Sequence, residues 1–346
     1  MAAADRPTIG VVTIGRNEGD RLVRCLQSLQ AQLPPTMPVV YVDSGSTDNS
    51  IQAAEQLGVT VVRLDMSVPF TMARGRNAGF EYLIDQYPDL DYVQFIDGDC
   101  ELVDGWLDSA LEFITKDESL AVVCGRRRER LPDASPYNRL ADMEWNTPVG
   151  EANACGGDAL MRVEAIRQVD GYNPKLIAGE EPEMCIRLRA KGWKIWRIDA
   201  DMTLHDAAIY RFGQWWKRSV RGGWAVAEGY ARHGAPPESY MRKEVRSGWL
   251  CGLIVPLLSV GLVLPTYGLS LLLLLGYGVL GWKIYRYRRQ VYDDCSQHAR
   301  LYAYYCTLSK LPQMVGQLRY RVNRLRRKDA VLIEYKGNSP APSAPS

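Results

Sequence analysis

The sequence is poor in histidine and has no closely spaced cysteine pair. There are only three histidines in 346 residues, at positions 205, 233 and 298. The 8 cysteines contain no CxxC motif, which argues against a structural zinc site and a secreted disulfide scaffold and favours a reducing compartment. The first ten residues lack a basic head followed by an apolar core, so we expect no cleaved signal peptide and a cytoplasmic front of the chain.

The net charge of +2 is small but unevenly distributed. Between Lys283 and Lys336 there are 13 Lys/Arg against 4 Asp/Glu, so the rest of the chain is acidic. This basic region predicts a partner of its own. We expect anionic lipid rather than nucleic acid, because no nucleic-acid recognition motif accompanies the charges.

From Thr8 to about Leu204 short β-rich runs alternate with helix-period segments, the pattern of a mainly parallel α/β sheet. The expected strands are Ile9–Ile14, Val39–Val42, Val59–Leu64, Tyr92–Ile96, Ala121–Gly125 and Lys194–Ile198. The expected helices are Leu22–Gln32, Asn49–Leu57, Met72–Gln86, Trp106–Lys116, Val163–Gln168 and Glu181–Lys191. Two segments that mix arginine with aromatics, 126–140 and 199–224, are expected to be substrate loops.

The segment Ser247–Trp282 is a run of 36 residues without a charged side chain. A single helix of that length would be about 54 Å long, against a hydrocarbon core of roughly 30 Å. We therefore expect a membrane hairpin broken at "LPTYG" (264–268), and basic residues on both flanks predict that both ends are cytoplasmic. A buried pair of core helices and a re-entrant hairpin are the alternatives.

After the hairpin, "KLPQMVGQLRYRVNRLRRK" (310–328) predicts an amphipathic basic helix that contacts anionic headgroups, or else a solvated basic face. The expected organisation is a catalytic domain over 1–230, a membrane-associated hairpin over 231–290, a basic region over 291–336 and a disordered tail over 337–346.

Two acids, Asp97 and Asp99, follow the apolar run Tyr92–Ile96 directly. They lie on the same side of an extended segment, and in an open α/β sheet ligands collect where strands end. Adjacent carboxylates repel unless a cation neutralises them, and hard oxygen ligands suit Mg²⁺ or Mn²⁺ bound together with a diphosphate. A turn with two capping acids would have the same sequence.

A second strand runs into "VDSGSTDNS" (42–50), which predicts either a nucleotide pocket or an ordinary polar turn with a helix cap. Together with "TIGRNEGDRLVRCLQSL" (13–29), "MARGRNAGF" (72–80) and "FIDGDC" (95–100), in this order, it resembles the GT-A-type family 2 glycosyltransferases over roughly residues 8–230.

The resemblance implies a Rossmann-like GT-A domain that transfers a sugar from a nucleoside diphosphate donor, UDP- or GDP-linked, with Mn²⁺ or Mg²⁺ and usually with inversion. Asp97 and Asp99 would be the family's DxD motif. The implied nucleotide-binding residues are Thr13, Arg16, Glu18, Asp43, Ser46, Arg74, Arg76, Asn77 and Asp97. The family often has two acids where this chain reads Asp43–Ser44, which leaves the donor base open.

The segment "ACGGDALMRVEAIRQVDGYNP" (154–174) resembles the family's acceptor-side motif, with Gly156 and Gly157 as its glycine pair. "IAGEEPEMCIRLRAKGW" (177–193) resembles the Glu-Asp motif at a helix start, which implies Glu181 as the catalytic base and Glu180 as the fallback. Both could instead be acids that merely favour a helix N-terminus.

His205 follows the last expected strand of this domain, and a neutral imidazole is a suitable third ligand for the metal beside Asp99 and Asp97, although a hydrogen-bonded surface histidine is the alternative. Next, "QWWKRSVRGGW" (214–224) partly resembles the QxxRW signature of processive synthases. It implies acceptor or diphosphate contacts from Trp215, Trp216, Arg218 and Arg221, unless the segment is a membrane-proximal amphipathic helix.

The predicted function is metal-dependent sugar transfer to a hydroxyl acceptor at the cytoplasmic membrane face, in glycan or glycolipid biosynthesis. The alternatives are a polyprenyl-phosphate sugar transferase and a membrane-tethered sugar-nucleotide binder without catalysis. A processive synthase is less favoured, because one hairpin is too little for a translocation channel.

Overall fold

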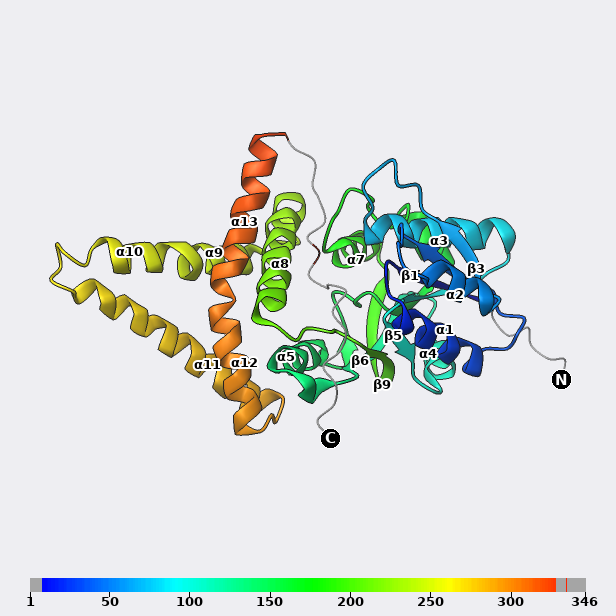
Figure 1. Cartoon of the computed structure of the whole chain (residues 1–346), viewed down its shortest axis with the longest axis horizontal. Helices are drawn as coiled ribbons and strands as arrows, with labels where there is room; N and C mark the ends of the chain where they lie inside the picture. The colour runs from blue at the N-terminus through cyan, green and yellow to red at the C-terminus, as the bar shows by residue number, and fades with distance from the viewer. Residues whose placement is uncertain (1–7, 328–333, 335–346) are drawn as a thin grey trace. The chain divides into compact units, whose positions relative to one another are not determined.

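The apolar runs of the first 205 residues form one mixed sheet covered by helices, in a computed structural model that describes residues 8–327 and 334 (Figure 1). The sheet has nine strands in the order β3-β2-β1-β4-β8-β6-β9-β5, with β7 paired to β9. The strands are β1 (Ile9–Gly15), β2 (Val39–Asp43), β3 (Thr60–Arg63), β4 (Tyr92–Asp97), β5 (Cys100–Leu102), β6 (Leu120–Glu129), β7 (Gly150–Glu151), β8 (Ala159–Arg162) and β9 (Lys194–His205).

The expected α/β class with a mainly parallel sheet is confirmed. Strands β3, β2, β1 and β4 are parallel neighbours, and β6 pairs parallel to β9. All six expected strands are present. The short strands β5, β7 and β8, which pair antiparallel with their neighbours, were not expected, because two to four residues carry too little periodicity to be recognised.

The helices between these strands lie close to their expected positions. They are α1 (Asp20–Gln32), α2 (Ser50–Gln56), α3 (Met72–Gln86), α4 (Trp106–Ile114), α6 (Val163–Gln168) and α7 (Glu180–Ala190), with a 3₁₀ turn, η1 (Pro132–Ala134), and α5 (Pro136–Trp145) as unexpected additions. Apolar faces of α3 and α4 pack on the sheet and bury one continuous core.

The chain leaves β1 toward β2 on one side and returns to β4 on the other side of β1. Such a reversal of strand order opens a crevice at the carboxyl ends of the two strands, where ligands bind in open α/β sheets. Here those ends are Gly15 and Asp97.

The two segments expected as substrate loops are largely regular structure, so that prediction was wrong for most of their length. Strand β6 continues through the arginines to Glu129 and β9 continues to His205. Arg128 pairs with Asp201 across these strands at 2.8 Å. A strand whose exposed half carries paired charges lacks the apolar alternation by which strands are recognised.

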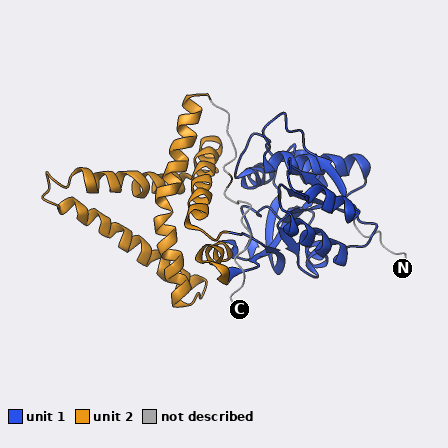
Figure 2. Ribbon diagram, in the orientation of Figure 1, with its two compact units in different colours: residues 1–132, 144–208 blue, residues 133–143, 209–346 orange. Residues whose placement is uncertain are grey.

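The described chain divides into two compact units (Figure 2). Unit 1 comprises residues up to 132 and 144–208, and unit 2 comprises 133–143 and 209 onward. The expected boundary at residue 230 falls inside α8, and the expected disordered tail, 337–346, lies outside the described residues. The helical elements of unit 2 after α5 are α8 (Phe212–His233), α9 (Arg242–Trp249), η2 (Leu250–Ile254), α10 (Val255–Gly261), η3 (Leu269–Leu274), α11 (Leu275–Val291), α12 (Ser296–Leu308) and α13 (Lys310–Leu325).

Helices α8 and α13 approach each other at two glycines. A Cβ atom on Gly223 would lie 2.0 Å from the carbonyl oxygen of Gln313, and one on Gly316 would lie 2.0 Å from that of Val220. The backbones are therefore too close for any larger residue at either position. One side of α13 is buried in this packing, and its arginines lie beyond the buried residues toward its C-terminal end.

The uncharged segment folds as two helical arms joined at residues 262–268, the position of the expected break (Figure 1). The Ser270 hydroxyl donates to the Ser259 carbonyl at 2.8 Å and joins the arms near the tip. Apolar side chains between Leu250 and Trp282 are widely exposed, with Leu264 at 86% and Tyr267 at 97%. The alternative of a buried core pair is therefore wrong for this part of unit 2.

None of the helices in the described part of the chain combines the length and apolar character needed to cross a membrane. The structure thus does not support the expected spanning hairpin. The physical reason is that each arm is interrupted, by the π-helical turn η2 in one and the 3₁₀ segment η3 in the other, so neither offers one long regular apolar helix.

Candidate active site

The two acids at the end of β4 face different partners. Asp97 closes the strand, and Gly98 donates to the Ile14 carbonyl of β1 at 2.8 Å, which fixes the turn at the crevice between the strands. Asp99 is buried, with 8% of its surface exposed, whereas the Asp97 side chain is 24% exposed. The two neighbouring acids therefore lie in different environments, because Asp99 is buried and the Asp97 side chain is partly exposed to solvent.

Asp97 is neutralised by two guanidinium groups. Arg76 on α3 donates to its Oδ1 at 2.7 Å, and Arg127 on β6 lies 3.5 Å from its Oδ2. Burial alone would lower the pKa of Arg76, but Asp97 and Glu180 raise it above its usual value. Arg76 therefore stays charged and offsets much of the repulsion expected between Asp97 and Asp99.

Asp99 lies opposite His205. Strand pairing sets Cys100 across from His205, so the preceding Asp99 places its Oδ1 3.5 Å from the His205 Nε2. The imidazole is held by the ring of Trp145, 4.5 Å away edge to face, and its Nδ1 lies 4.0 Å from the Glu129 carboxylate. The predicted proximity of Asp99 and His205 is thus present, and both side chains are buried.

The two acids at the start of α7 are also separated by environment. The Glu180 carboxylate accepts from Arg76 at 2.9 Å, so Arg76 links it to Asp97. The Glu181 Oε1 accepts from the Cys155 backbone N–H at 2.5 Å and lies 3.1 Å from the sulfurs of Cys155 and Cys185. Burial raises the pKa of Glu181, although these hydrogen bonds oppose the shift.

The glycine pair borders this cluster. A Cβ on Gly157 would lie 2.7 Å from Arg76 Nη2 and 2.8 Å from Asp97 Oδ2, so only glycine fits without displacing the ion pair. Gly156 has a positive φ of 84° and would meet nothing with a Cβ. The segment that contains them thus passes directly against the acidic cluster, by which we mean Asp97, Asp99, Glu180 and Glu181 with Arg76 and His205.

The loop after β2 is built around Asp43. Its Oδ2 accepts from the backbone N–H groups of Gly45 and Ser46, both at 2.9 Å, and its Oδ1 accepts from Tyr41 at 3.0 Å. The Ser46 hydroxyl accepts from the Asn17 N–H at 2.9 Å. Asp43 and Ser46 therefore shape the loops at the ends of β2 and β1, beside the crevice.

The remaining predicted nucleotide residues serve local structure as well. Thr13 is fully buried in β1, and Glu18 pairs with Arg21 at 2.8 Å. Arg16 lies over the Phe70 ring at 4.5 Å. The other two sit on α3: Arg74 donates to carbonyls of the 65–69 loop, and Asn77 exchanges two hydrogen bonds with the Tyr172 backbone.

Trp215, Trp216, Arg218 and Arg221 all lie on α8, in unit 2. Trp215 is buried there and packs against Tyr137 and Tyr305. Trp216 contacts the Phe212 ring at 5.8 Å. Asp97, Asp99, Glu180, Glu181 and His205 belong to unit 1, whereas these four residues belong to unit 2.

Sequence reasoning missed Arg127, Asp158, Trp145 and the two cysteines. Asp158 is fully buried, accepts from the Asp97 N–H at 3.0 Å and pairs with Arg127 at 2.8 Å. Arg127 also lies over the Trp145 ring at 5.6 Å. The aspartate directly after Gly156–Gly157 and the arginine run 126–128 were the available signals, and the run was mistaken for a loop.

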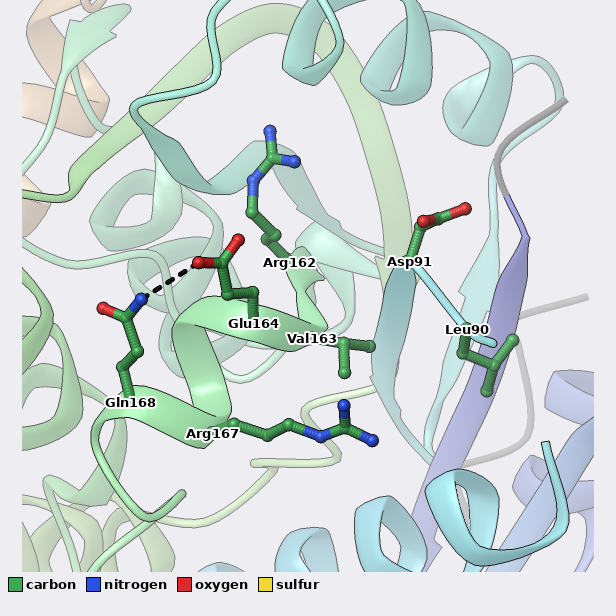
Figure 3. Close-up of a pocket in the computed structure, with 7 residues that line it drawn as sticks. All are labelled: Leu90, Asp91, Arg162, Val163, Glu164, Arg167 and Gln168. Carbon is green, nitrogen blue, oxygen red and sulfur yellow. Dashed lines mark hydrogen bonds between the residues drawn. The ribbon is translucent and has the colours of Figure 1, made fainter. Parts of the chain in front are cut away.

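A separate cavity of about 400 Å³ opens beside β4 and α6, lined by Leu90, Asp91, Arg162, Val163, Glu164, Arg167 and Gln168 (Figure 3). Its polar groups largely serve the fold: Asp91 accepts from Thr8 at 2.8 Å, and Arg162 donates to Leu120 and Ile114 carbonyls. None of its lining residues belongs to the acidic cluster, so we assign it no role in the site.

Comparison with known proteins agrees with this geometry. The family described as "Glycosyl transferase family 2" matches residues 10–169. Succinoglycan biosynthesis protein ExoA of Rhizobium meliloti (strain 1021) is 24% identical over 64% of this chain and 69% of its own length. Pre-mycofactocin glycosyltransferase of Mycobacterium tuberculosis is 24% identical over 73% of this chain. This chain spans about half of that relative, 53% of its length.

Among solved structures, a mannosyltransferase from Pyrobaculum calidifontis, in complex with GDP-Man and Mn²⁺, superposes with a TM-score of 0.59. The match covers 92% of this chain and 88% of that one at 15% identity, so it bears on the fold alone. The family match includes β1, β2, β4 and Asp158, the parts of the chain that build the crevice and its acids. Residues 10–169 of the chain therefore match glycosyl transferase family 2, and the chain is similar to glycosyltransferases of that family.

Proposed function

We propose that this glycosyltransferase moves a sugar from a nucleoside diphosphate donor to a hydroxyl acceptor, with inversion and with Mn²⁺ or Mg²⁺. The observation that carries the proposal is the buried pair Asp99–His205 at the strand-order reversal. Asp97 ends β4 two residues before Asp99, and it pairs with Arg76, which also pairs with Glu180. A UDP- or GDP-linked sugar is the expected donor.

The residues present fit a divalent cation. A carboxylate oxygen and an imidazole nitrogen 3.5 Å apart can both reach an ion at roughly 2.0–2.2 Å. Asp99 and His205 would hold it, with Asp97 beside them and open positions left for diphosphate oxygens. When bound, the ion would offset charge on the departing diphosphate.

The chain's own groups supply the remaining chemistry. Arg76 and Arg127 pair with the Asp97 carboxylate and hold it in place, and the loops around Asp43 and Ser46 border the nucleoside. Glu181 is the better base of the two α7 acids, because Glu180 is held by Arg76 whereas burial raises the pKa of Glu181. A raised pKa improves proton acceptance from the acceptor hydroxyl during in-line attack.

We propose further that the apolar arms hold the enzyme on the cytoplasmic membrane face. A hairpin that lies in the interface does not need a spanning helix, and exposed Leu264 and Tyr267 at its tip would enter the acyl boundary. The exposed arginines near the end of α13 would contact anionic headgroups. A lipid-linked or membrane-extruded glycan acceptor fits this location.

The first experiment is a thermal-shift screen of UDP, GDP, CDP and dTDP with and without Mn²⁺, followed by donor hydrolysis with the selected sugar nucleotide. We expect one nucleotide to stabilise the protein only with the metal, and its sugar conjugate to be hydrolysed. No shift with any nucleotide would contradict the proposal. Binding without turnover across a broad acceptor panel would favour a binding protein.

The membrane location is tested by co-sedimentation with vesicles of phosphatidylcholine containing phosphatidylglycerol. Replacing Leu264 and Tyr267 together by Asp should release the protein from the vesicles. Leu131→Asp, at an apolar side chain of unit 1 that is 42% exposed, is the matched control and should leave binding unchanged. Equal binding by all three proteins would refute the hairpin as the anchor.

A further inference from the structure

Two cysteine thiols and a carboxylate converge beneath the glycine pair. The sulfurs of Cys155 and Cys185 are 3.8 Å apart, and each lies 3.1 Å from the same oxygen, Oε1 of Glu181. Glu181 and Cys185 are four residues apart on α7 and so share one face of the helix. Cys155 arrives from the segment that precedes Gly156, and all three side chains are buried.

These separations are close to those of ligand atoms around a tetrahedral zinc ion. With Zn–S of about 2.3 Å and Zn–O of about 2.0–2.2 Å, tetrahedral angles put two sulfurs about 3.8 Å apart and a sulfur and an oxygen about 3.5 Å apart. The sulfur–sulfur separation already has that value. The sulfur–oxygen separations are a few tenths of an ångström shorter, as expected while the thiols are protonated and hydrogen-bonded to the carboxylate.

The donor set also selects the kind of ion. Thiolate ligands favour Zn²⁺ over the hard ions Mg²⁺ and Mn²⁺, which prefer oxygen. Burial raises the pKa of Cys155 well above its usual value. The hydrogen bond with Cys155 lowers the pKa of Cys185, but burial and the charge of Glu181 outweigh it and raise that pKa to about 11, so without metal both thiols keep their protons. An ion could approach from the side of Gly156, where an added Cβ would meet no atom within 4 Å.

We propose that Cys155, Glu181 and Cys185 form a Zn²⁺ site, and that its occupation inhibits sugar transfer by removing Glu181 from catalysis. Binding replaces two thiol protons, which pass to solvent, and leaves a fourth position for water. The site is distinct from the Asp99–His205 pair. Its inhibitory effect, unlike the binding itself, rests on the proposed role of Glu181 as the base.

The absence of a CxxC pair argued only against a structural zinc site. The fold overcomes the spacing of thirty residues between Cys155 and Cys185 by bringing α7 against the glycine segment. This geometry differs from that of a structural zinc centre, because the unmetallated cluster already has its hydrogen bonds. We therefore expect Zn²⁺ to bind this site reversibly, as a regulatory ion.

The test uses the full chain with a non-thiol reductant, excess Mg²⁺ to occupy the oxygen-rich site, and Co²⁺ as a spectroscopic substitute for Zn²⁺. We expect one equivalent of Co²⁺ to give a thiolate-to-cobalt charge-transfer band that Zn²⁺ abolishes. Loss of an outer-shell partner of a metal ligand costs about 10–100-fold in affinity, so loss of a ligand itself should cost at least as much. Cys185→Ser should lose the band and weaken Zn²⁺ binding at least about 100-fold, and Glu181→Gln should weaken it at least about tenfold while preserving the shape of the site.

Cys100→Ser is the matched control, because Cys100 is buried beside Asp99 and is the other thiol near a predicted ligand pair. It should keep the band. Absence of the band in the unaltered protein, its survival in Cys185→Ser, or a Cys155–Cys185 disulfide found by mass spectrometry in the freshly reduced protein would overturn the site. A normal band with donor hydrolysis unaffected by Zn²⁺ would refute only the inhibitory role.

Discussion

Replacing Arg76 by Met would remove the cation that joins three parts of the site. Its guanidinium is 2% exposed, donates to Asp97 at 2.7 Å and to Glu180 at 2.9 Å, and lies over the Tyr172 ring at 5.6 Å. Met keeps most of the length and apolar contact of the side chain. The change therefore isolates the charge and its hydrogen bonds.

The magnitude follows from the burial of the partners left behind. Glu180 is 6% exposed, so losing Arg76 would leave a buried carboxylate without the guanidinium that pairs with it, and Asp97 would keep its pairing with Arg127. Breaking a buried ion pair from one side costs about 3–5 kcal/mol. Two hydrogen bonds to charged groups, at about 1.5–3 kcal/mol each, lead to a similar figure.

The assay is urea unfolding of the full chain, with hydrogen exchange of β4 and α7 amides used to follow unit 1 separately. With a urea dependence of about 1–3 kcal/mol per molar, a loss of 3 kcal/mol lowers the midpoint by at least about 1 M. Arg63→Met is the control, because that exposed side chain meets Glu55 at 3.4 Å and should contribute less than about 1 kcal/mol.

A double-mutant cycle decides the mechanism. Glu180→Gln removes the buried charge, so adding it to Arg76→Met should recover at least about 1 kcal/mol of the loss. The reasoning is refuted if Arg76→Met behaves like the Arg63 control, or if the two substitutions are simply additive.

Three further predictions concern the cluster. Asp99→Ala should abolish the Mn²⁺-dependent part of the nucleotide thermal shift, whereas His298→Ala in unit 2 should keep it; an unchanged shift in Asp99→Ala would contradict the metal assignment. Because the folded pKa of Glu181 is raised above its ordinary 4.5, the native state binds that proton more tightly, and stability is lost as pH rises through the raised value. Glu181→Gln should therefore unfold at a higher temperature than the parent at neutral pH but not at about pH 4, and should lose transfer; equal melting curves at both pH values would oppose it. Gly157→Ala would press a methyl group against Arg76 and Asp97 and should slow transfer about tenfold or more, while Gly213→Ala, where a Cβ meets nothing, should not; similar rates would argue against close packing here.

Much of the fold followed from hydrophobic periodicity. Helices α3 and α6 begin and end as expected, and the acids after β4 were placed correctly at the end of a buried strand. The ends of β6 and β9 were lost because their polar residues pair with one another across the sheet. Strand pairing, rather than local pattern, extends them to Glu129 and His205.

Within the site, sequence order predicted which acids are candidates, but not which cation or hydrogen bond faces each of them. The repulsion between Asp97 and Asp99 suggested a cation shared by both, whereas the structure gives Asp97 two arginines and Asp99 a histidine. Arg127 and Cys155 entered the cluster through tertiary packing. Cys155 has no local signal that sets it apart from the other cysteines of the chain, and the arginine run 126–128, which was the signal for Arg127, was mistaken for a loop.

Most of α5 belongs to unit 2, and this has a consequence for how the enzyme can be divided. Residues 133–143 interrupt unit 1 in the sequence, and Tyr137 packs there against Trp215 and Tyr305 from far later in the chain. Cutting after Ala208 would leave the Tyr137 ring without those two partners. The two units are thus not consecutive in the sequence. Exchanging the helical unit between relatives would require transplanting residues 133–143 as well as the chain from residue 209 onward.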